Sequence, residues 1–248
     1  MPGMMDKMAK KALENKNFQQ AWEYHCKWFG PMLEPAFAEN DAARVHLVAA
    51  LNKISRKDTK GGMEKLKKLE KACACDADWA AWLFCCGLCH EMAGEQQEMV
   101  SFYQKAACMQ PDFYYPHGKI AKWAYAQGKY DEAEECYHAS IRALENMEMD
   151  AMNTLLLSSA WMNLASCLVM AGKYAEAEAA LAKSAQIQPE MPKRKGIEIM
   201  LYAAMKDENR ARAKLEELKT ESALLAMGVE NVMESVLNGT HPHFNQNT

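Results

Sequence analysis

The sequence predicts an all-α chain built from stacked pairs of antiparallel helices. One pattern occurs twice, as Ala126–Glu134 and as Met170–Glu178, and each copy places a Gly-Lys-Tyr turn between an amphipathic run and an alanine-rich run. A glycine in the left-handed conformation ends one helix and allows the next to begin. Glycine and proline are also few, 12 and 8 in 248 residues, and strand-like alternation is hard to find.

A period of 34 residues extends this pattern. Gly94 lies 34 residues before Gly128, and Pro111 and Pro189 occupy position 32 of their blocks, where proline ends a second helix. Large residues at positions 4, 7 and 11 form one helical stripe, and small residues at positions 8, 20 and 27 let helix axes approach closely. The blocks are 80–113, 114–147 and, ten residues late, 158–191.

These blocks resemble tetratricopeptide repeats, whose pattern has Trp at 4, Leu at 7, a small residue at 8, Gly before Tyr at the turn, Ala at 20 and Pro at 32. The best match is through Trp161, Leu164, Ala165, Gly172, Tyr174, Ala177 and Pro189. The other blocks depart from the pattern at His90, Met99, His117 and Glu145. The resemblance implies a right-handed α-α superhelix, a solenoid of about five to six helix pairs followed by a C-terminal capping helix.

Residues 1–79 are expected to form degenerate helix pairs of the same kind. The turn-like stretch 14–17 would separate the first two helices, and Asn40-Asp41 offers a cap for a helix that runs to about Ser55. Extending the 34-residue register backward places the next turn at Gly61-Gly62.

The C-terminal part is expected to continue the array more weakly. Block 192–225 is a faded repeat, and residues 226–238 are expected to form a capping helix that is broken or bent near Gly228. The insertion 148–157 holds no glycine or proline, so we expect it to lengthen the flanking helices, an exposed loop being the alternative. Residues 239–248 form a polar tail that we expect to be flexible.

Composition argues against several classes of partner. A net charge of −4 and an isoelectric point near 6.0 give no general attraction to nucleic acid or anionic lipid. Residues 1–11 carry four charged side chains and no apolar core of a signal peptide, and no run approaches the ~18 apolar residues that span a bilayer. Nine cysteines fit a reducing compartment. We therefore expect a cytoplasmic location, with no membrane and no nucleic-acid partner.

The sharpest short motif is Cys86-Gly87-Leu88-Cys89-His90, which matches the C-x-x-C-H pattern for covalent haem attachment. Cys86, Gly87 and His90 occupy positions 7, 8 and 11, which pack inside the other blocks. Zinc is the alternative, with a ligand pool of Cys73, Cys75, Cys85, Cys86, Cys89 and His90, but the three ligands within one helical turn do not form a tetrahedral cage unless another helix contributes. We expect core packing here, with no metal and no cofactor.

Motifs for enzymatic chemistry are absent from the sequence. No phosphate-binding loop, dinucleotide fingerprint, zinc-protease motif or nucleophile elbow occurs. Four carboxylates gather in residues 131–135, but they stand at the start of a second helix, where they favour its dipole. The chain is predicted not to be an enzyme.

The resemblance also implies where a ligand would bind. In tetratricopeptide repeats, positions 2, 5, 6, 9, 12 and 13 of the first helix in each pair line a concave groove. Methionines and aromatic residues there suit apolar partners, and lysines suit an acidic or C-terminal carboxylate group. Alternatively, Met162, Met170 and Met200 are partly buried between repeats. The predicted groove residues are Phe84, Leu88, Tyr115, Lys119, Lys122, Tyr125, Met162, Asn163, Ser166 and Lys193.

These observations lead to one main hypothesis of function: a protein-protein interaction scaffold that binds a peptide segment or a protein subunit in the concave groove. The alternative is a structural homo-oligomer that associates through its terminal helix, Leu224–Leu237, or through a methionine-rich surface. RNA binding is disfavoured by the acidic balance of charge.

Overall fold

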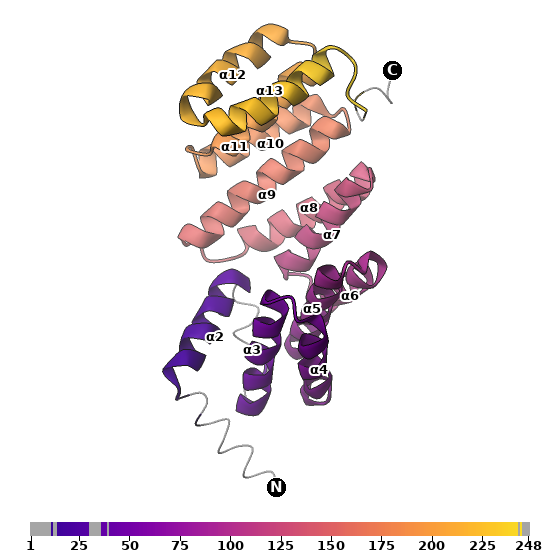
Figure 1. Cartoon of the computed structure of the whole chain (residues 1–248), viewed down its shortest axis with the longest axis vertical. Helices are drawn as coiled ribbons and strands as arrows, with labels where there is room; N and C mark the ends of the chain where they lie inside the picture. Colours follow the sequence, from indigo (N-terminus) through magenta and orange to yellow (C-terminus); the bar gives the residue numbers. More distant parts are fainter. Residues whose placement is uncertain (1–10, 12–13, 30–35, 39, 243, 245–248) are drawn as a thin grey trace. The chain divides into compact units, whose positions relative to one another are not determined.

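The computed structural model describes residues 11, 14–29, 36–38, 40–242 and 244. Within these residues the regular structure is helical and no β-strand occurs, so the predicted all-α class is confirmed (Figure 1). The chain divides into two compact units, an N-terminal unit of residues 1–120 and a C-terminal unit of residues 121–248. The helices are α2 (Lys16–Phe29), α3 (Asp41–Ser55), α4 (Thr59–Leu69), the short 3-10 helix η2 (Glu70–Ala72), α5 (Asp76–Ala93), α6 (Gln96–Met109), α7 (Tyr114–Ala126), α8 (Tyr130–Glu145), α9 (Ala151–Met170), α10 (Tyr174–Ile187), α11 (Pro192–Ala204), α12 (Glu208–Glu221) and α13 (Ala223–Leu237).

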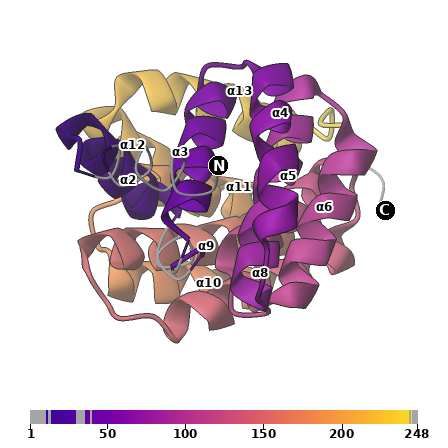
Figure 2. The same cartoon turned by 90° about the horizontal axis from the view of Figure 1, so that it is seen from below.

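The N-terminal unit contains two well-packed helix pairs, α3 with α4 and α5 with α6, and α4 also packs against α5 (Figure 2). The predicted cap is present at Asn40, whose side chain accepts a hydrogen bond from the Ala43 N–H over 3.0 Å. Helix α2 packs on α3. The helix expected before residue 14 falls almost entirely outside the described residues.

The turn between α3 and α4 lies earlier than the predicted position. Asp58 caps α4 by accepting a hydrogen bond from the Gly61 N–H over 2.9 Å, so both predicted turn glycines lie inside the helix. A Cβ atom added to Gly62 would lie 2.9 Å from the Ile54 side chain. Gly62 therefore serves close helix packing and not chain reversal.

The turn glycines Gly94, Gly128 and Gly172 were predicted correctly. They connect equivalent helices and have φ angles of 78°, 73° and 76°, in the left-handed region that favours glycine. After Gly172, the Lys173 N–H donates to the Leu168 carbonyl over 2.9 Å, and the other two turns make the same bond. One local geometry thus joins the helices of three successive pairs.

Two further turns adopt this geometry without glycine. Lys57 and Lys206 have φ angles of 62° and 61°, between α3 and α4 and between α11 and α12. The same backbone bond follows each lysine, as in Asp207 N–H to the Tyr202 carbonyl over 2.9 Å. The repeat therefore continues in backbone geometry where the glycine signal is missing from the sequence.

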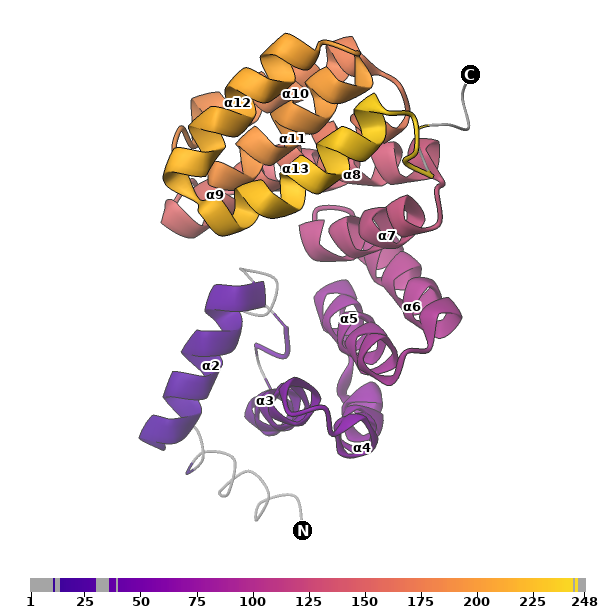
Figure 3. The same ribbon diagram turned by 45° about the horizontal axis from the view of Figure 1, so that its top comes forward.

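In the C-terminal unit, α9 pairs with α10 and α11 with α12, and α13 packs on both α11 and α12 (Figure 3). The insertion 148–157 lengthens only the helix that follows it. Helix α9 begins at Ala151, where Asp150 accepts a hydrogen bond from the Asn153 N–H over 2.6 Å, and α8 has already ended at Glu145.

The last helix differs from its prediction in two respects. Helix α13 begins at Ala223, before the expected residue 226, and it continues through Gly228 without a break. Nothing lies within 4 Å of a Cβ atom added to Gly228, so this glycine stands on an open face of the helix.

Helix α9 is a longer apolar stretch than expected, since no run of about 18 apolar residues was predicted. The helix has 20 residues, and its most apolar window of 18 residues has a mean hydropathy of 1.2. By length and composition alone, such a helix could cross a membrane. Half of that window is buried inside the fold, where α9 packs against α8, α10 and α11. Its central place in the unit accounts for this composition.

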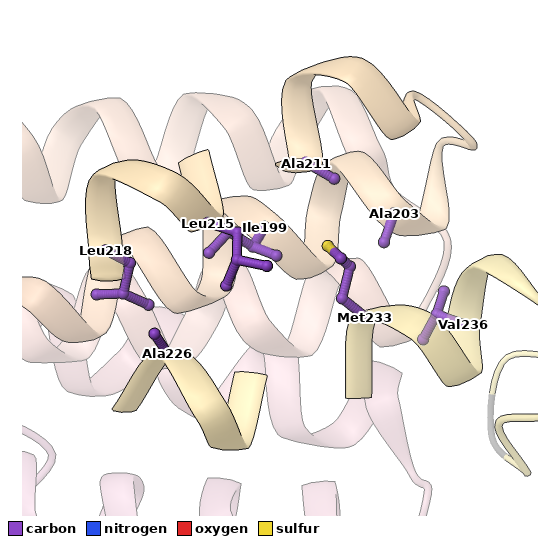
Figure 4. Close-up of a cluster of buried hydrophobic side chains, with 8 residues drawn as sticks. All are labelled: Ile199, Ala203, Ala211, Leu215, Leu218, Ala226, Met233 and Val236. Carbon is purple, nitrogen blue, oxygen red and sulfur yellow. The ribbon is translucent and has the colours of Figure 1, made fainter. Parts of the chain in front are cut away.

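A cluster of fully buried side chains holds the last three helices together (Figure 4). Figure 4 shows side chains from α11, α12 and α13 converging on the space between these helices. This cluster fixes the place of α13 against α11, on which the site described below depends. Its members are Ile199, Ala203, Ala211, Leu215, Leu218, Ala226, Met233 and Val236.

Candidate functional site

An apolar groove of about 460 Å³ lies in the C-terminal unit. Its walls come from α9, α11 and α13, which are the first helices of their pairs or, for α13, the helix that follows the last pair. Tyr125 of α7 and two residues that follow α13, His241 and Phe244, complete the lining. The groove thus lies on the side of the helices that the resemblance assigned to a ligand.

Helices α9 and α11 each present one face to the groove. Helix α9 contributes Ser166, Val169 and Met170, and α11 contributes residues such as Ile197 and Met200, at spacings of three and four residues. Residues at these spacings share one side of a helix. In the 34-residue register they are positions 9, 12 and 13 of one block and positions 6 and 9 of the next.

Helix α13 also lines the groove, through Leu225, Val229 and Val232. It approaches α11 closely at Gly196, where an added Cβ atom would lie 3.3 Å from Cγ2 of Val229. A larger residue at position 196 would push the two helices apart and widen the groove.

Lys193 supplies the groove with a positive charge. It lies exposed in the first turn of α11, and no carboxylate among the described residues pairs with it. Its neighbours are already engaged, since the Arg194 guanidinium donates to the Gln188 carbonyl over 2.7 Å and the Lys195 ammonium pairs with Glu221. Lys193 is therefore available to an anionic group on a ligand.

Two hydroxyl groups meet on another part of the lining. The Tyr125 hydroxyl and the Ser166 Oγ are 3.3 Å apart, and either can be the donor. The remaining capacity of these hydroxyls allows them to bond a polar group of a ligand.

The chain after α13 closes one side of the groove. Gly239 adopts a φ of 69°, and the N–H groups of Thr240 and His241 both donate to the Ser235 carbonyl, over 2.8 and 3.0 Å. The rings of His241 and Phe244 stand edge to face with centroids 5.1 Å apart. Both side chains thereby come to line the same apolar surface.

The structure brings together three of the predicted groove residues, Tyr125, Ser166 and Lys193. Met170 and Met200, which the alternative placed between repeats, are half-buried and also line the groove.

Three other predicted groove residues are buried, and for them the prediction is wrong. Phe84 is 0% exposed, because its ring packs against Phe113 at 4.9 Å and Tyr103 at 5.7 Å. Leu88 and Met162 are 8% and 5% exposed. Side chains at these positions face neighbouring helices and loops, so a ligand cannot reach them.

The remaining predicted residues are accessible but lie away from this groove. Lys119 is engaged within the N-terminal unit, where its Nζ lies 2.8 Å from both carboxylate oxygens of Glu91. The ring of Tyr115 is half-buried and tilted against that of Tyr114, with ring centroids 4.2 Å apart. Lys122 and Asn163 are exposed, outside the groove lining.

Sequence reasoning missed the wall formed by α13 and the two residues beyond it. Leu225, Val229 and Val232 carry helical spacing, and that signal was assigned to a cap that covers the core. The helix has one wide apolar face, on which Ala226, Met233 and Val236 are buried in the core cluster, while Leu225, Val229 and Val232 line the groove. No periodic signal marks His241 or Phe244.

The cysteine motif is used for packing. Cys86 and Cys89 are buried, and burial raises the pKa of the Cys89 thiol to about 11. His90 stacks on Phe102 at 5.0 Å, and its Nδ1 lies 2.6 Å from a carboxylate oxygen of Glu95. Protonated thiols are poor ligands, since metals bind the thiolate.

Comparison with known proteins places this arrangement among helical repeats. The family model described as tetratricopeptide repeat matches residues 119–192. The solved structure of pilF from Pseudomonas aeruginosa is 17% identical in sequence, with 82% of this chain and 90% of that chain covered at a TM-score of 0.57, which indicates a shared fold. The comparison with curated proteins finds no match.

Weaker similarity extends to a quorum sensor. The apo form of NprR from B. thuringiensis is 13% identical, with 96% of this chain and 79% of that chain covered at a TM-score of 0.38. NprR in complex with its cognate peptide NprX is 14% identical, with 100% and 86% covered at a TM-score of 0.34. Similarity at this level does not bear on the site.

Proposed function

Because this chain belongs to the tetratricopeptide-repeat family, we propose that it is a non-enzymatic interaction scaffold whose C-terminal groove holds an apolar segment of a partner protein. The observation that carries the proposal is the groove itself, an apolar hollow of about 460 Å³ lined in part by Lys193, which pairs with no carboxylate among the described residues. A concave apolar site with few polar groups is the usual form of a binding site.

The chemistry of the lining defines the partner. Methionine side chains such as Met170 and Met200 adapt to varied apolar groups, which suits a segment with large apolar residues. Lys193 favours an acidic side chain or a C-terminal carboxylate on the same segment. An exposed ion pair adds little affinity, so we assign Lys193 to orientation and the apolar lining to affinity.

The spacing of these groups gives the segment an approximate length. Lys193 and Met200 are seven residues apart on α11, which corresponds to about 10 Å along the helix axis. An extended peptide spans that distance in about three residues. We therefore expect the carboxylate to stand about three residues from an apolar anchor in the partner.

A matched pair of substitutions on α13 tests the proposal. Val232→Asp places a charge in the groove, whereas Leu224→Asp places the same charge on the exposed side of the helix, since Leu224 is 84% exposed. A partner is first identified by affinity capture, and its binding segment is then titrated calorimetrically.

We expect Val232→Asp to weaken binding of that segment by roughly tenfold or more, because position 232 is 37% exposed in the free protein and the bound segment would bury an uncompensated charge there. Leu224→Asp should leave the affinity unchanged. Equal binding by the wild type and Val232→Asp, with both folded by circular dichroism, would place the partner elsewhere on the chain.

The exposed side of α13 supports a second candidate, self-association. Leu224 and Met227 are 84% and 65% exposed, and large apolar side chains so exposed on one helix favour contact with another surface. Sedimentation at several concentrations tests this directly. A concentration-dependent mass that Leu224→Asp abolishes and Val232→Asp retains would support a homo-oligomer, and a constant monomer mass would reject it.

We also propose a cytoplasmic location. The eight cysteines whose side chains the structure describes are unpaired, and several are buried in helix interfaces, which suits a reducing compartment. Fractionation of cells that express the tagged full chain tests this, and recovery in a secreted or membrane fraction would contradict it.

A further inference from the structure

Phe244 lines the groove that we assign to a partner and covers part of its apolar wall. It lies seven residues beyond the end of α13, and it packs, half-buried, against the cluster formed by α11, α12 and α13. Figure 4 shows Met233 and Val236 of that cluster on α13, and both lie in the last part of the helix. Phe244, like His241, thus contributes an aromatic ring from beyond α13 to a surface built mainly by helices.

The fold directs this part of the chain toward the groove. The Ser235 carbonyl accepts hydrogen bonds from Thr240 and His241, and the Lys206 ammonium donates to the Val236 carbonyl over 2.8 Å. These bonds fix the end of α13 and the turn at Gly239, so Thr240 and His241 do not continue the helix. The Phe244 N–H donates to the His241 carbonyl over 3.3 Å, and its side chain, which has no polar group, packs against the His241 ring and the apolar cluster.

We propose that the groove contains a subsite for an aromatic anchor, that Phe244 fills this subsite in the free protein, and that a partner displaces it with an aromatic side chain of its own. This inference rests on the proposed function of the groove. Aromatic residues suit such an anchor because they bury a large area while losing few rotatable bonds.

An internal occupant reduces the apparent affinity of every competing ligand. Only the fraction of molecules in which Phe244 has left the subsite can bind, so the apparent Kd equals the intrinsic Kd divided by that fraction. Removing the ring should therefore tighten binding. A larger ring at the same position should weaken it.

The test uses the full-length protein with 1-anilinonaphthalene-8-sulfonate, a fluorescent probe with aromatic rings and one sulfonate. The rings suit the apolar lining, and the sulfonate suits Lys193. Four proteins are titrated: the wild type, Phe244→Ala, Phe244→Trp and Val232→Asp. We expect Phe244→Ala to bind the probe about three- to tenfold more tightly than the wild type, and Phe244→Trp to bind no more tightly than the wild type.

The outcomes separate this inference from the proposed function. Weaker binding by Val232→Asp with tighter binding by Phe244→Ala supports both. Weaker binding by Val232→Asp with equal binding by the wild type and Phe244→Ala keeps the groove as a binding site and overturns the role of Phe244. If Val232→Asp leaves binding unchanged, or if the probe binds none of the proteins, both the proposed function and this inference fall.

A spectroscopic measurement tests the occupied state without any ligand. In protein labelled with carbon-13 at the methionine methyl groups, an aromatic ring in the groove shifts the resonances of nearby methyls. We expect Phe244→Ala to move the methyl signal of Met170 or Met200, which line the groove, and to leave that of the buried Met162 unchanged. Unchanged signals from both groove methionines would show that the ring lies elsewhere, which overturns the inference.

Discussion

Lys57 and Lys206 adopt a left-handed backbone conformation that is unfavourable for any residue with a Cβ atom. Both have φ near +60°, where the Cβ atom of an ordinary residue crowds the following carbonyl. Three equivalent turns use Gly94, Gly128 and Gly172 instead. At the two lysines, packing of the helices on both sides of the turn stabilises a backbone conformation that lysine by itself disfavours.

Exchanging lysine and glycine between these turns should change stability in opposite directions. Lys57→Gly is expected to raise the free energy of unfolding by about 1 kcal/mol, since the strain disappears. Gly172→Lys should lower it by about 1 kcal/mol through strain alone, because nothing lies within 4 Å of a Cβ atom added there. Urea unfolding measures both, and changes of equal sign would contradict this account.

The ring of Tyr103 leaves no room for a side chain at Gly87. A Cβ atom added at Gly87 would lie 2.5 Å from Cε1 of Tyr103, which is fully buried. The Tyr103 hydroxyl is held at 2.6 Å from a carboxylate oxygen of Glu91, so the ring cannot easily move aside.

Gly87→Ala should therefore lower the free energy of unfolding by about 1 to 3 kcal/mol through overpacking, although alanine favours helix formation. Gly228→Ala on the open face of α13 serves as the control and should be neutral or stabilising. Thermal melting of both variants tests the prediction. If Gly87→Ala were as stable as Gly228→Ala, the Tyr103 ring would have to shift without loss of stability, and the prediction would be wrong.

At the scale of the element, α9 combines a buried face with a side chain less buried than its repeat position predicts. Trp161 occupies position 4 of its repeat, where the tetratricopeptide pattern has tryptophan, yet it is only partly buried. Ser158, one turn earlier, is fully buried and its Oγ lies 2.9 Å from the Ser184 Oγ. Helix α9 begins at Ala151, so the insertion adds seven residues to the helix before the repeat block at Ser158.

Trp161→Ala should lower the free energy of unfolding by about 2 to 3 kcal/mol, less than the ~3 to 5 kcal/mol typical of a fully buried aromatic side chain. Leu164→Ala, at a position only 1% exposed, gives the reference for complete burial on the same helix. Chemical denaturation of the two variants decides the order. A larger loss for Trp161→Ala would mean that the indole carries more of the packing than its exposure indicates.

Some helix boundaries could be predicted from the sequence and others could not. The turns at Gly128 and Gly172 were predictable because each repeats one motif, and the cap at Asn40 was predictable because asparagine accepts the orphan N–H of a first turn. The turn at Lys57 was not predictable, because lysine gives no local signal for positive φ.

The groove was predictable only where the repeat register reaches. Tyr125, Ser166 and Lys193 follow from their register positions. Phe84 was misplaced because its partner Phe113 belongs to the segment before α7, which helical periodicity does not describe. Val232 and Phe244 lie beyond the last repeat, so only tertiary structure brings them to the site.

At the scale of the molecule, a stack of helix pairs transmits destabilisation mainly to its neighbours. Leu215 of α12 is 2% exposed and belongs to the cluster shared by α11, α12 and α13. Its loss should therefore loosen these helices first, and the helices of the N-terminal unit should respond least.

Hydrogen exchange on Leu215→Ala tests this expectation. Amide protection should fall by about tenfold or more in α11 to α13, which corresponds to a local loss of at least ~1.4 kcal/mol, and it should be unchanged in α5 and α6. A uniform fall across all helices would show that the whole chain unfolds as one cooperative body.

The turn at Gly239 is the same left-handed bend that elsewhere leads from the first helix of a pair into the second. Helix α13 consequently ends as a first helix does, although the described residues place no helix after it. A designer could use this as a splice point: an added helix patterned on α12 would enter an existing bend, lengthening the array by one module without new loop engineering.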